Sequence, residues 1–278
     1  FHYYLCRQLK GGGMEIIMTE KRVAIVTGGT RGMGQAISVE LAKRGNIVCA
    51  VYRSDEESAK ETLKKIQELA PESGIYKVDV SQEQEIKRFV DEIGTKFGRI
   101  DILVNNAGIF DFRFIDEMDG EYLDRVLNTN FKSQFFMLQN VAEYMKKNHY
   151  GRIANASSIS GRFADCGLVA YAASKAGVDM MTRIGAAELG PYNISVNAYA
   201  PGIIHTDMTD AMIQERGDEQ VRDLCLNRFG TGEDVAALVG FLTSPEGGYV
   251  TGEIIGIDGG MFKVQNTYLA YEHAKKNG

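Results

Sequence analysis

Short apolar segments alternate with longer amphipathic segments along most of the chain. Runs rich in Val, Ile and Ala predict buried strands, and apolar residues spaced three and four apart predict helices between them. The predicted strands cover residues 21–27, 47–52, 75–78, 102–105, 152–156, 195–200 and 253–257. The predicted helices cover residues 35–44, 55–69, 82–97, 120–147, 170–189 and 233–243, and a polar, helix-prone region extends from Pro201-Gly202 to about Asn227.

This alternation predicts an α/β fold. Strands that are apolar on both faces are typical of a parallel sheet covered by helices on both sides. Because parallel crossovers are right-handed, the sequence predicts a doubly wound, Rossmann-type parallel sheet in a three-layer sandwich. No linker or change of composition divides the pattern. We therefore expect a single domain over residues 21–262, with an N-terminal extension (1–20) and a C-terminal tail (263–278).

The first 18 residues, FHYYLCRQLKGGGMEIIM, do not follow this pattern. They lack the charged start and the cleavage site of a secretory signal. The chain does not begin with Met, and Met14 and Met18 lie just before the first clear strand. We expect an upstream extension; the alternative is an aromatic arm, Phe1 to Leu9, that packs on the body or near the substrate entrance.

Composition and charge exclude several classes of function. Hydrophobic residues make up 44% of the 278 positions and charged residues 24%, which is typical of a soluble globular protein. A net charge of −6 provides no basic surface for nucleic acid or for an anionic membrane, so we expect no nucleic-acid partner. No apolar run approaches the roughly 20 residues that a membrane-spanning helix needs.

The four cysteines and four histidines are dispersed along the chain. No close pair has the spacing of a zinc site or of a disulfide framework, so we expect no metal site. Free thiols are typical of a reducing compartment, and we therefore expect the protein in the cytoplasm.

A glycine-rich segment, TGGTRGMG at residues 27–34, lies between the first predicted strand and the first predicted helix. Glycine allows the backbone to approach a pyrophosphate closely, and the amino end of a helix supplies unpaired N–H groups and a positive dipole. The Gly-x-x-x-Gly-x-Gly spacing differs from the common dinucleotide-binding pattern, and a glycine cluster alone also suits a tight turn. Its place between strand and helix favours phosphate contacts. The candidate residues are Gly28, Thr30, Arg31, Gly32, Met33 and Gly34.

Two further segments end predicted strands on the side of the sheet where ligands bind in such folds. Asp79 and Val80 follow the third strand, and the Asp79 carboxylate is placed to meet an adenine amine. Asn106, Ala107 and Gly108 follow the fourth strand, with small residues that permit close backbone approach. Because Asn, Asp and Gly also favour ordinary turns, a turn without a ligand is the alternative at each position.

The end of the second strand usually separates NAD from NADP. An acidic residue there holds the ribose 2′-hydroxyl, whereas Arg suits a 2′-phosphate. This chain has Arg53 at that point and no carboxylate before Asp55, and Arg31 is a second candidate cation. We therefore expect NADP(H), with NAD(H) as the alternative because Asp55, Glu56 and Glu57 weaken the local positive field.

Tyr171 and Lys175 lie four residues apart at the start of the predicted helix 170–189. Residues four apart share one face of a helix, so the two side chains are expected to stand together. A phenol has a pKa of about 10, and a neighbouring ammonium group lowers this pKa toward the range that is useful for proton transfer. Such pairs also occur on many helices without a chemical role.

Together, these motifs resemble the short-chain dehydrogenase/reductase family. The matching motifs are TGGTRGMG at 27–34, NNAG at 105–108, a serine (Ser158) thirteen residues before Tyr171, YAASK at 171–175 and PG at 201–202. The resemblance extends from about Lys21 to Phe262 and rests on the order and spacing of all the motifs. It implies an enzyme that transfers a hydride between a nicotinamide cofactor and a ketone or secondary alcohol.

The resemblance assigns roles by position. Tyr171 matches the general acid and base, and Lys175 matches the residue that lowers the tyrosine pKa and binds the nicotinamide ribose. Ser158 matches the hydroxyl that orients the substrate carbonyl. Asn130 matches the helix residue that holds a proton-relay water near the lysine. The resemblance also implies cofactor contacts from Pro201, Gly202, Ile204 and Thr206.

The segment YVTGEIIGIDGGMF at 249–262 resembles the 3-oxoacyl carrier-protein reductases of this family. Members that act on carrier protein are expected to have Arg near the ends of two long helices, where this chain has His149 and Tyr192. Lys146 and Lys147 remain, so the docking of an acidic carrier protein is weakened rather than excluded. The acidic net charge gives no long-range attraction to such a partner.

The tail and several apolar loop residues favour another substrate. Hydroxysteroid dehydrogenases of the family can use an extended tail to wall an apolar pocket, and residues 263–278 include Tyr268, Leu269 and Tyr271. We therefore expect a bulky apolar ketone or secondary alcohol, such as a hydroxysteroid, with a 3-oxoacyl thioester as the alternative. The polar region up to about Asn227 is either a substrate lid or an ordinary pair of surface helices. The loop residues that add apolar surface are Ile109, Phe110, Phe112, Phe114, Phe163 and Leu168.

A third class, a nucleotide-binding redox sensor without catalysis, stays open. The joint presence of Asn130, Ser158, Tyr171 and Lys175 favours an enzyme over such a sensor. The family resemblance also implies a homotetramer, with the predicted helices at 120–147 and 170–189 at its interfaces.

Overall fold

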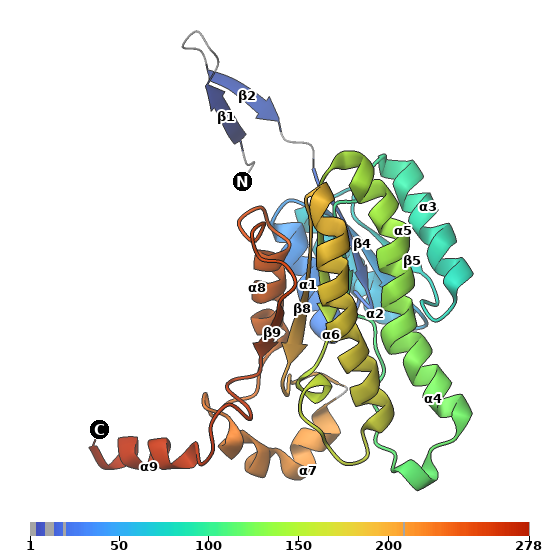
Figure 1. The fold of residues 1–278 in the computed structure, drawn as a ribbon. Helices are drawn as coiled ribbons and strands as arrows, with labels where there is room; N and C mark the ends of the chain where they lie inside the picture. Colours follow the sequence, from blue (N-terminus) through green and yellow to red (C-terminus); the bar gives the residue numbers. More distant parts are fainter. Residues whose placement is uncertain (1–3, 9–13, 19–20, 208, 278) are drawn as a thin grey trace.

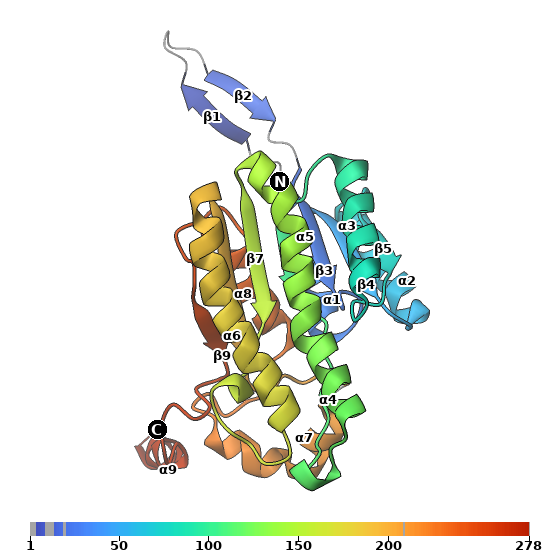
Figure 2. The same cartoon turned by 45° about the vertical axis from the view of Figure 1, so that its right-hand side comes forward.

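The computed structural model describes residues 4–8, 14–18, 21–207 and 209–277. Within these ranges the predicted strands form one parallel sheet of seven strands, in the order β5-β4-β3-β6-β7-β8-β9 (Figures 1 and 2). The strands are β3 (Val23–Thr27), β4 (Ile47–Tyr52), β5 (Gly74–Lys77), β6 (Ile102–Asn105), β7 (Gly151–Ala156), β8 (Ile194–Pro201) and β9 (Ile254–Ile257). The predicted α/β fold with a doubly wound, Rossmann-type parallel sheet is confirmed.

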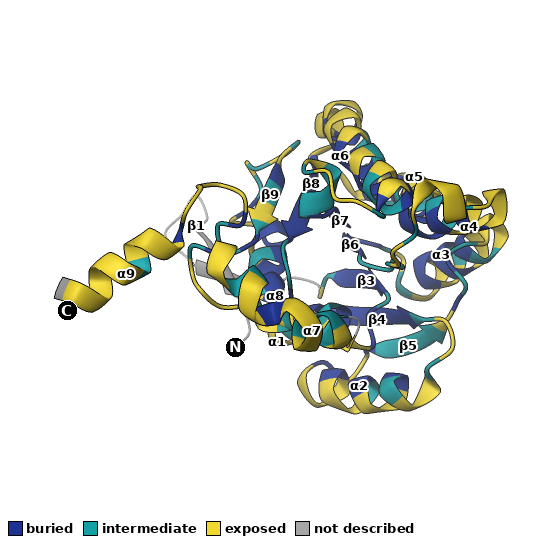
Figure 3. Cartoon of the chain, turned by 90° about the horizontal axis from the view of Figure 1, so that it is seen from below, coloured by how far each residue is buried: buried dark blue, intermediate teal, exposed yellow. Residues whose placement is uncertain are grey.

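Helices cover both faces of this sheet, as the view along the strands shows (Figure 3). The helices are α1 (Gly32–Lys43), α2 (Glu56–Leu69), α3 (Glu83–Phe97), α4 (Gly120–Leu127), α5 (Ser133–Asn148), α6 (Val169–Leu189), α7 (Asp210–Gln220), α8 (Gly232–Leu242) and α9 (Tyr268–Asn277). Helices α1, α2 and α8 cover one face, and α3 to α6 cover the other. Helix α7 lies beyond the carboxyl ends of the strands (Figure 1). Short 3-10 turns lie at η1 (Ile115–Glu117), η3 (Ile159–Gly161), η4 (Gly190–Tyr192) and η5 (Val221–Asp223).

The core consists of two apolar layers, one on each face of the sheet. Because successive strand residues point to opposite faces, Ile25 and Leu103 pack in the layer that α3, α5 and α6 cover. Val26 and Val104 pack in the opposite layer, against α1, α2 and α8. All four side chains are fully buried. Both faces of a central strand must therefore be apolar, which explains the nearly continuous apolar runs in the sequence.

Successive strands are added on one side of β3 up to β5 and on its other side from β6 onward. β3 pairs with β4 on one side and with β6 on the other, and later strands add outward from each. The loops that leave β3 and β6 therefore run to opposite faces of the sheet and open a crevice at its carboxyl edge, where ligands bind in folds of this kind.

The predicted helix over 120–147 is interrupted in the structure. Between α4 and α5 the chain forms a π-helical turn, η2 (Asn128–Lys132), in which the Ser133 amide donates to the carbonyl of Asn128 five residues earlier. Such turns are rare and often occur at functional sites. This turn carries Asn130, which the sequence assigned to the active site.

The N-terminal extension contains a hairpin that the hydrophobic pattern did not predict. β1 (Tyr4–Gln8) and β2 (Met14–Met18) pair in antiparallel fashion and form a sheet of their own. Figures 1 and 2 place this hairpin beyond the amino ends of the main strands, at the opposite end of the sheet from α7. The alternative of an aromatic arm near the substrate entrance is therefore wrong for Tyr4–Gln8, whereas residues 1–3 and 9 lie outside the described residues.

The C-terminal tail forms a helix, α9, whose start is attached to the segment after α7. The Thr267 hydroxyl donates to the Arg222 carbonyl, and the Tyr271 hydroxyl donates to the Cys225 carbonyl. The tail therefore packs on the candidate lid region.

The described part of the chain has no helix that is both long and apolar enough to cross a membrane. Within the same ranges, no group of three or more His, Cys, Asp and Glu side chains is arranged to hold a metal ion.

Gly34, in the first turn of α1, packs against the preceding loop more closely than a side chain allows. A β-carbon at this position would lie 1.9 Å from the Gly28 carbonyl oxygen. The loop after β3 and the amino end of α1 are thus held against each other, and this contact sets the shape of the crevice next to β3.

We expect Gly34→Ala to lower the free energy of unfolding by about 1–3 kcal/mol, because the added methyl group forces the loop and the helix apart. Thermal or denaturant unfolding measures this loss, and titration with a nicotinamide nucleotide should show weaker binding. The control is Gly120→Ala at the start of α4, where a β-carbon would meet nothing within 4 Å. If Gly34→Ala unfolded at the same midpoint as the wild type, the packing argument would be wrong.

Candidate active site

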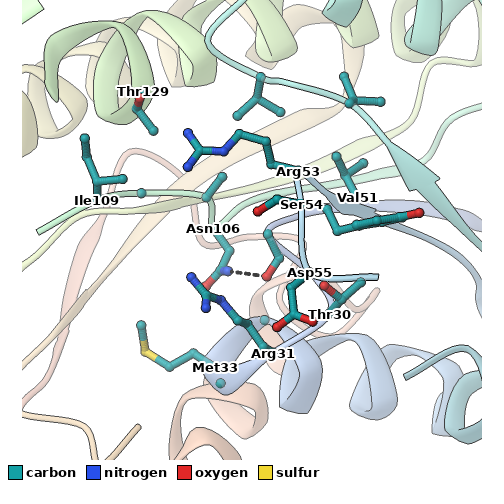
Figure 4. A pocket seen from close by; sticks show the side chains of 18 of the residues that line it. Thr30, Arg31, Met33, Val51, Arg53, Ser54, Asp55, Asn106, Ile109 and Thr129 are labelled. Carbon is teal, nitrogen blue, oxygen red and sulfur yellow. Dashed lines mark hydrogen bonds between the residues drawn. The ribbon is translucent and has the colours of Figure 1, made fainter. Parts of the chain in front are cut away.

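A cavity of about 370 Å³ lies at the carboxyl ends of β3, β4, β5 and β6 (Figure 4). Most of the predicted cofactor residues line it: Gly28, Thr30, Arg31, Gly32, Met33, Gly34, Arg53, Asp79, Val80, Asn106, Ala107, Gly108 and Thr206. Sequence reasoning did not assign further lining residues to the cofactor, namely Val51, Tyr52, Ser54, Asp55, Val78, Ile109, Thr129 and Asp207. A cavity of this size is typical of a small-molecule or cofactor site.

The loop between β3 and α1 is shaped to hold a phosphate group. Gly28 and Gly32 have φ angles of +59° and +51°, which a residue with a side chain rarely adopts. A β-carbon on Gly28 would also come within 3.1 Å of the Ala107 backbone. The first turn of α1 contains no acidic residue, and the side chain of Arg31 does not cap it. The amino end of α1 therefore presents its N–H groups and positive dipole to the cavity, which fits a pyrophosphate.

Asn106 braces this loop from the neighbouring strand. Its side-chain amide donates to the carbonyls of Thr27 (3.2 Å) and Gly28 (3.1 Å), and its carbonyl oxygen accepts from the Tyr199 hydroxyl (3.2 Å). The Thr27 hydroxyl in turn accepts from the amides of Asn106 and Ala107, both at 3.0 Å. The Asn106 side chain is thus engaged in protein contacts, so its contribution to a nucleotide site is to hold the glycine loop in place (Figure 4).

Two arginines and one carboxylate meet at the end of β4. Arg31 and Arg53 both line the cavity, together with Ser54. Asp55 caps α2, because its carboxylate accepts from the Ser58 amide (3.0 Å) and the Ser58 hydroxyl (2.7 Å). These hydrogen bonds, with a smaller effect of the nearby Arg31 charge, lower the pKa of the Asp55 carboxyl. Of the three acidic residues that weaken the NADP(H) prediction, Asp55 is therefore engaged as the cap of α2, whereas Glu56 and Glu57 lie in the first turn of that helix.

Asp79 lines the same cavity beyond the end of β5. Its Oδ1 atom accepts from the amide (3.0 Å) and the hydroxyl (2.8 Å) of Ser81, which orients the carboxylate. The expected contact with an adenine amine is compatible with this position and stays a prediction.

Thr206 is the predicted nicotinamide-end residue that reaches the cavity. Its amide donates to the Thr209 hydroxyl (3.0 Å), and its methyl group would be 3.5 Å from a β-carbon on Gly32. Pro201, Gly202 and Ile204 are not among the described residues that line this cavity. They shape the loop that leads to Thr206: the Gly202 amide donates to the carbonyl at the end of β9, and Ile204 is buried.

The predicted catalytic side chains meet where β7 ends and α6 begins. Ser158 follows β7 and is buried, and its side chain forms a hydrogen bond with the Tyr171 phenol in the first turn of α6. The Lys175 ammonium lies 5.5 Å from the centre of the Tyr171 ring and donates to the Ala156 carbonyl (2.8 Å). Local helix geometry sets the Tyr–Lys pair, whereas the Ser–Tyr contact depends on the packing of α6 against β7.

Asn130 approaches this group from the π turn. It is fully buried, and its side chain both accepts from the Ile109 amide (2.8 Å) and donates to the Ile109 carbonyl (2.9 Å). A β-carbon on Gly108 would lie 3.3 Å from Asn130 Oδ1 and 3.8 Å from Lys175 Nζ. Asn130 therefore anchors the loop after β6 close to Lys175, and its proposed role in holding a water remains a prediction.

The electrostatics differ from the sequence-based expectation. Burial raises the pKa of the Tyr171 phenol, although the Ser158 hydrogen bond opposes this increase. Burial also lowers the pKa of the Lys175 ammonium to about 8, against an opposing effect of Asp179. The sequence predicted a phenol pKa lowered by Lys175. In the structure desolvation dominates, because both groups are buried and the ammonium binds the Ala156 carbonyl instead of the phenol oxygen.

Two further residues contact this group, and of these only Asp179 was not predicted from the sequence. Asp179, one turn after Lys175, accepts a hydrogen bond from the Ser157 hydroxyl, and its place four residues after Lys175 was the available signal. Phe110 packs edge-on against the Tyr171 ring, with ring centres 5.1 Å apart. Phe110 was expected to add apolar surface near the catalytic tyrosine, and this contact agrees with that expectation.

Comparisons with known proteins identify the family of this chain. The family model described as enoyl-(acyl carrier protein) reductase matches residues 28–262. The 3-oxoacyl-[acyl-carrier-protein] reductase FabG of Thermotoga maritima is 40% identical over 242 residues, which cover 87% of this chain and 98% of that protein. The corresponding protein of Staphylococcus epidermidis is 37% identical over 239 residues, covering 86% of this chain and 98% of that protein.

A solved structure shows the same fold. A doubly substituted variant of a short-chain dehydrogenase/reductase from Serratia marcescens superposes with a TM-score of 0.82 at 33% identity, covering 86% of this chain and 97% of that chain. The matched regions cover nearly the whole length of these relatives. The chain therefore belongs to the short-chain dehydrogenase/reductase family, and it is an NAD(P)-dependent oxidoreductase that acts on CH–OH and ketone groups.

Proposed function

We propose that this protein is an NADPH-dependent reductase of 3-oxoacyl thioesters. The observation that carries the proposal is the match, over 98% of their length, to relatives named as 3-oxoacyl-[acyl-carrier-protein] reductases. The expectation of a hydroxysteroid rested on the C-terminal tail and on apolar loop residues near Tyr171. The start of α9 contacts the carbonyls of Arg222 and Cys225 in the candidate lid region, and α9 is not among the described residues that line the nucleotide cavity, so the proposal follows the relatives instead.

The chain's own residues suit the reduction of a carbonyl. The bound cofactor supplies the hydride. Ser158 and Tyr171 lie within hydrogen-bond reach of each other, so both hydroxyls can contact one carbonyl oxygen. Tyr171 then donates the proton that neutralises the developing alkoxide, and Ser158 holds the oxygen in place. Lys175 supplies a positive charge beside the phenol, and Asn130 fixes the loop that closes this side of the site.

Two features of the cavity support NADPH over NADH. Arg31 and Arg53 line the cavity at the end of β4, where a ribose 2′-phosphate is held in folds of this kind. Asp55, which could otherwise accept a 2′-hydroxyl, is hydrogen-bonded to Ser58 as the cap of α2. Guanidinium groups bind phosphate through charge-assisted hydrogen bonds.

The acyl carrier is a second part of the proposal. The relatives' names point to a carrier protein, whereas the two expected arginine positions hold His149 and Tyr192. Their rings lie 6.4 Å apart, and the Lys146 ammonium lies 4.9 Å from the centre of the Tyr192 ring. This cationic and aromatic surface gives an acidic carrier fewer charge contacts than two arginines would. A cytoplasmic location suits this metabolism, and Cys49, Cys166 and Cys225 are free thiols.

Steady-state assays test the substrate. With NADPH, we expect a higher kcat/KM for 3-oxoacyl thioesters of N-acetylcysteamine, CoA or carrier protein than for ketosteroids or simple sugars. In the Tyr171→Phe variant, kcat should fall by a factor of about 10²–10⁴, because phenylalanine lacks the hydroxyl that donates the proton. The variant should still bind NADPH, because it retains the ring.

Two results would decide against this proposal. A preference for ketosteroids would restore the hydroxysteroid function. Wild-type protein that bound NADPH but reduced no carbonyl in the panel would instead favour the non-catalytic sensor.

Nucleotide preference is tested at the two arginines. We expect Arg53→Ala and Arg31→Ala each to raise the KM for NADPH by about 10-fold or more, with little change for NADH, because each removes a charged hydrogen bond to phosphate. Lys64→Ala is the control, since Lys64 is exposed on α2 outside the cavity lining. Equal effects on NADH and NADPH would show that the arginines do not read the 2′-phosphate.

We further propose a homotetramer with α5 and α6 at its interfaces. The outward faces of these helices carry large exposed apolar side chains, Phe135, Met180 and Ile184. Light scattering after size-exclusion chromatography should give about four times the 30.7 kDa mass of one chain. We expect Ile184→Glu to reduce this mass, and a monomeric wild type would refute the assembly.

A further inference from the structure

Asp179 is a buried carboxylate behind the catalytic group. Its side chain is 7% exposed, and it lies on α6 one turn after Lys175 and two turns after Tyr171. Its Oδ1 atom accepts from the Ser157 hydroxyl, and its Oδ2 atom lies 3.5 Å from Arg162 Nε. A carboxylate is costly to bury unless it is paired and hydrogen-bonded, so this position imposes a constraint on its surroundings.

Three consecutive residues form hydrogen bonds to α6: Ala156 at the end of β7, and Ser157 and Ser158 just after it. The Ala156 carbonyl accepts from Lys175, the Ser157 hydroxyl donates to Asp179, and the Ser158 side chain bonds to Tyr171. The three partners on α6 are spaced four residues apart, so they lie along one face of the helix. Along the β7 segment, the bond to Asp179 comes from the second of the three residues. Along α6, Asp179 is the last of the three partners.

Ser157 links α6 to the backbone that carries Ser158. The Ser157 amide also donates to the Tyr199 carbonyl on β8 (2.9 Å), which fixes its backbone from the other side. Arg162, just after η3, binds the Ile254 carbonyl (2.6 Å) at the start of β9 as well as facing Asp179. Asp179 therefore joins α6 to the segment that carries Ser158.

Asp179 also acts on the charge of Lys175. The ammonium is buried, and the groups that face it are the Ala156 carbonyl on β7, Asn130 on η2, and Tyr171 and Asp179 on α6. Of these groups, only Asp179 is an anion at neutral pH, and its charge favours the protonated ammonium. Arg162 also faces Asp179, with its Nε atom 3.5 Å from Oδ2, and it is about one-third exposed, so its own charge is partly screened by solvent.

We propose that Asp179 is a positioning residue of this active site: it ties Ser157 to α6 so that Ser158 meets Tyr171, and it balances the buried charge of Lys175. This inference rests on the reductase chemistry proposed above. It makes two separable predictions, one for geometry and one for charge.

Asp179→Asn removes the charge while it keeps the size of the side chain. We expect kcat for the best carbonyl of the panel to fall about tenfold or more, because small misplacements of reacting groups are costly. The pKa of Lys175, about 8 in the wild type, should fall by about one pH unit. Because the ammonium is then lost at lower pH, the alkaline limb of the kcat profile should move to lower pH.

Ser157→Ala separates the two effects, since it removes the hydrogen bond and leaves the carboxylate. We expect a similar fall in kcat with little movement of the alkaline limb. Glu188→Gln, which neutralises an exposed acid on the same helix, is the matched control and should change neither quantity. Unfolding midpoints and NADPH fluorescence titrations at pH 6 establish that each variant is folded and binds nucleotide.

A direct titration makes the test independent of the substrate. In protein labelled with ¹³Cε-lysine, the NMR signal that disappears in Lys175→Arg reports the protonation of Lys175. A lower midpoint in Asp179→Asn supports the charge role even if the proposed thioester substrate is wrong. If folded Asp179→Asn kept both the wild-type midpoint and a kcat within twofold, the proposal would be overturned. If Asp179→Asn did not fold, an unaltered kcat in Ser157→Ala would overturn the geometric part.

Discussion

The active site depends on how the end of β7 is held against α6. The backbone of β7 is fixed by its neighbours β6 and β8, and α6 is fixed by its packing on the same strands. Bonds from three consecutive residues then set the register between the two elements, with Ser158 against Tyr171 and Ala156 against Lys175. A shift of α6 by one turn would break all three bonds at once, so packing of the core determines the catalytic geometry.

The nucleotide side is organised around a second close contact. The approach of α1 to the loop after β3 requires glycine at position 34, and Asn106 on the neighbouring loop holds the same segment through two carbonyls. The positive end of α1, Arg31 beside it and Arg53 at the end of β4 then face one cavity. Rigid backbone positions, rather than flexible side chains, form most of this phosphate site, which reduces the entropy that binding must overcome.

Burial shifts the pKa values of the catalytic groups and also strengthens the effect of the charges and hydrogen bonds around them. Desolvation raises the pKa of Tyr171 and lowers the pKa of Lys175, so each group is shifted toward its neutral form. In such surroundings, a nearby charge or hydrogen bond has a larger effect than it would in water. The Ser158 hydroxyl and the Asp179 carboxylate both oppose these shifts, and both are held in place by the contact between β7 and α6.

Much of the fold follows from local pattern. Apolar runs long enough for buried strands, separated by amphipathic helices, predicted all seven parallel strands and their helical layers within the described ranges. The pair Tyr171 and Lys175 was visible for the same reason, because residues four apart meet on any helix. The interruption at Asn128–Lys132 was not predicted, although its Asn-Thr-Asn run consists of residues with low helix propensity.

The sequence by itself determined the α/β alternation, the glycine loop and the Tyr–Lys spacing, because each depends on residues close together in the chain. Only the tertiary structure decided that Asn106 braces the glycine loop and that Asp179 binds Ser157. It also placed the start of α9 on the segment after α7. Several of these contacts join residues far apart in sequence, as with Asn106 and Gly28, so their distances are set by how the layers pack and not by local periodicity.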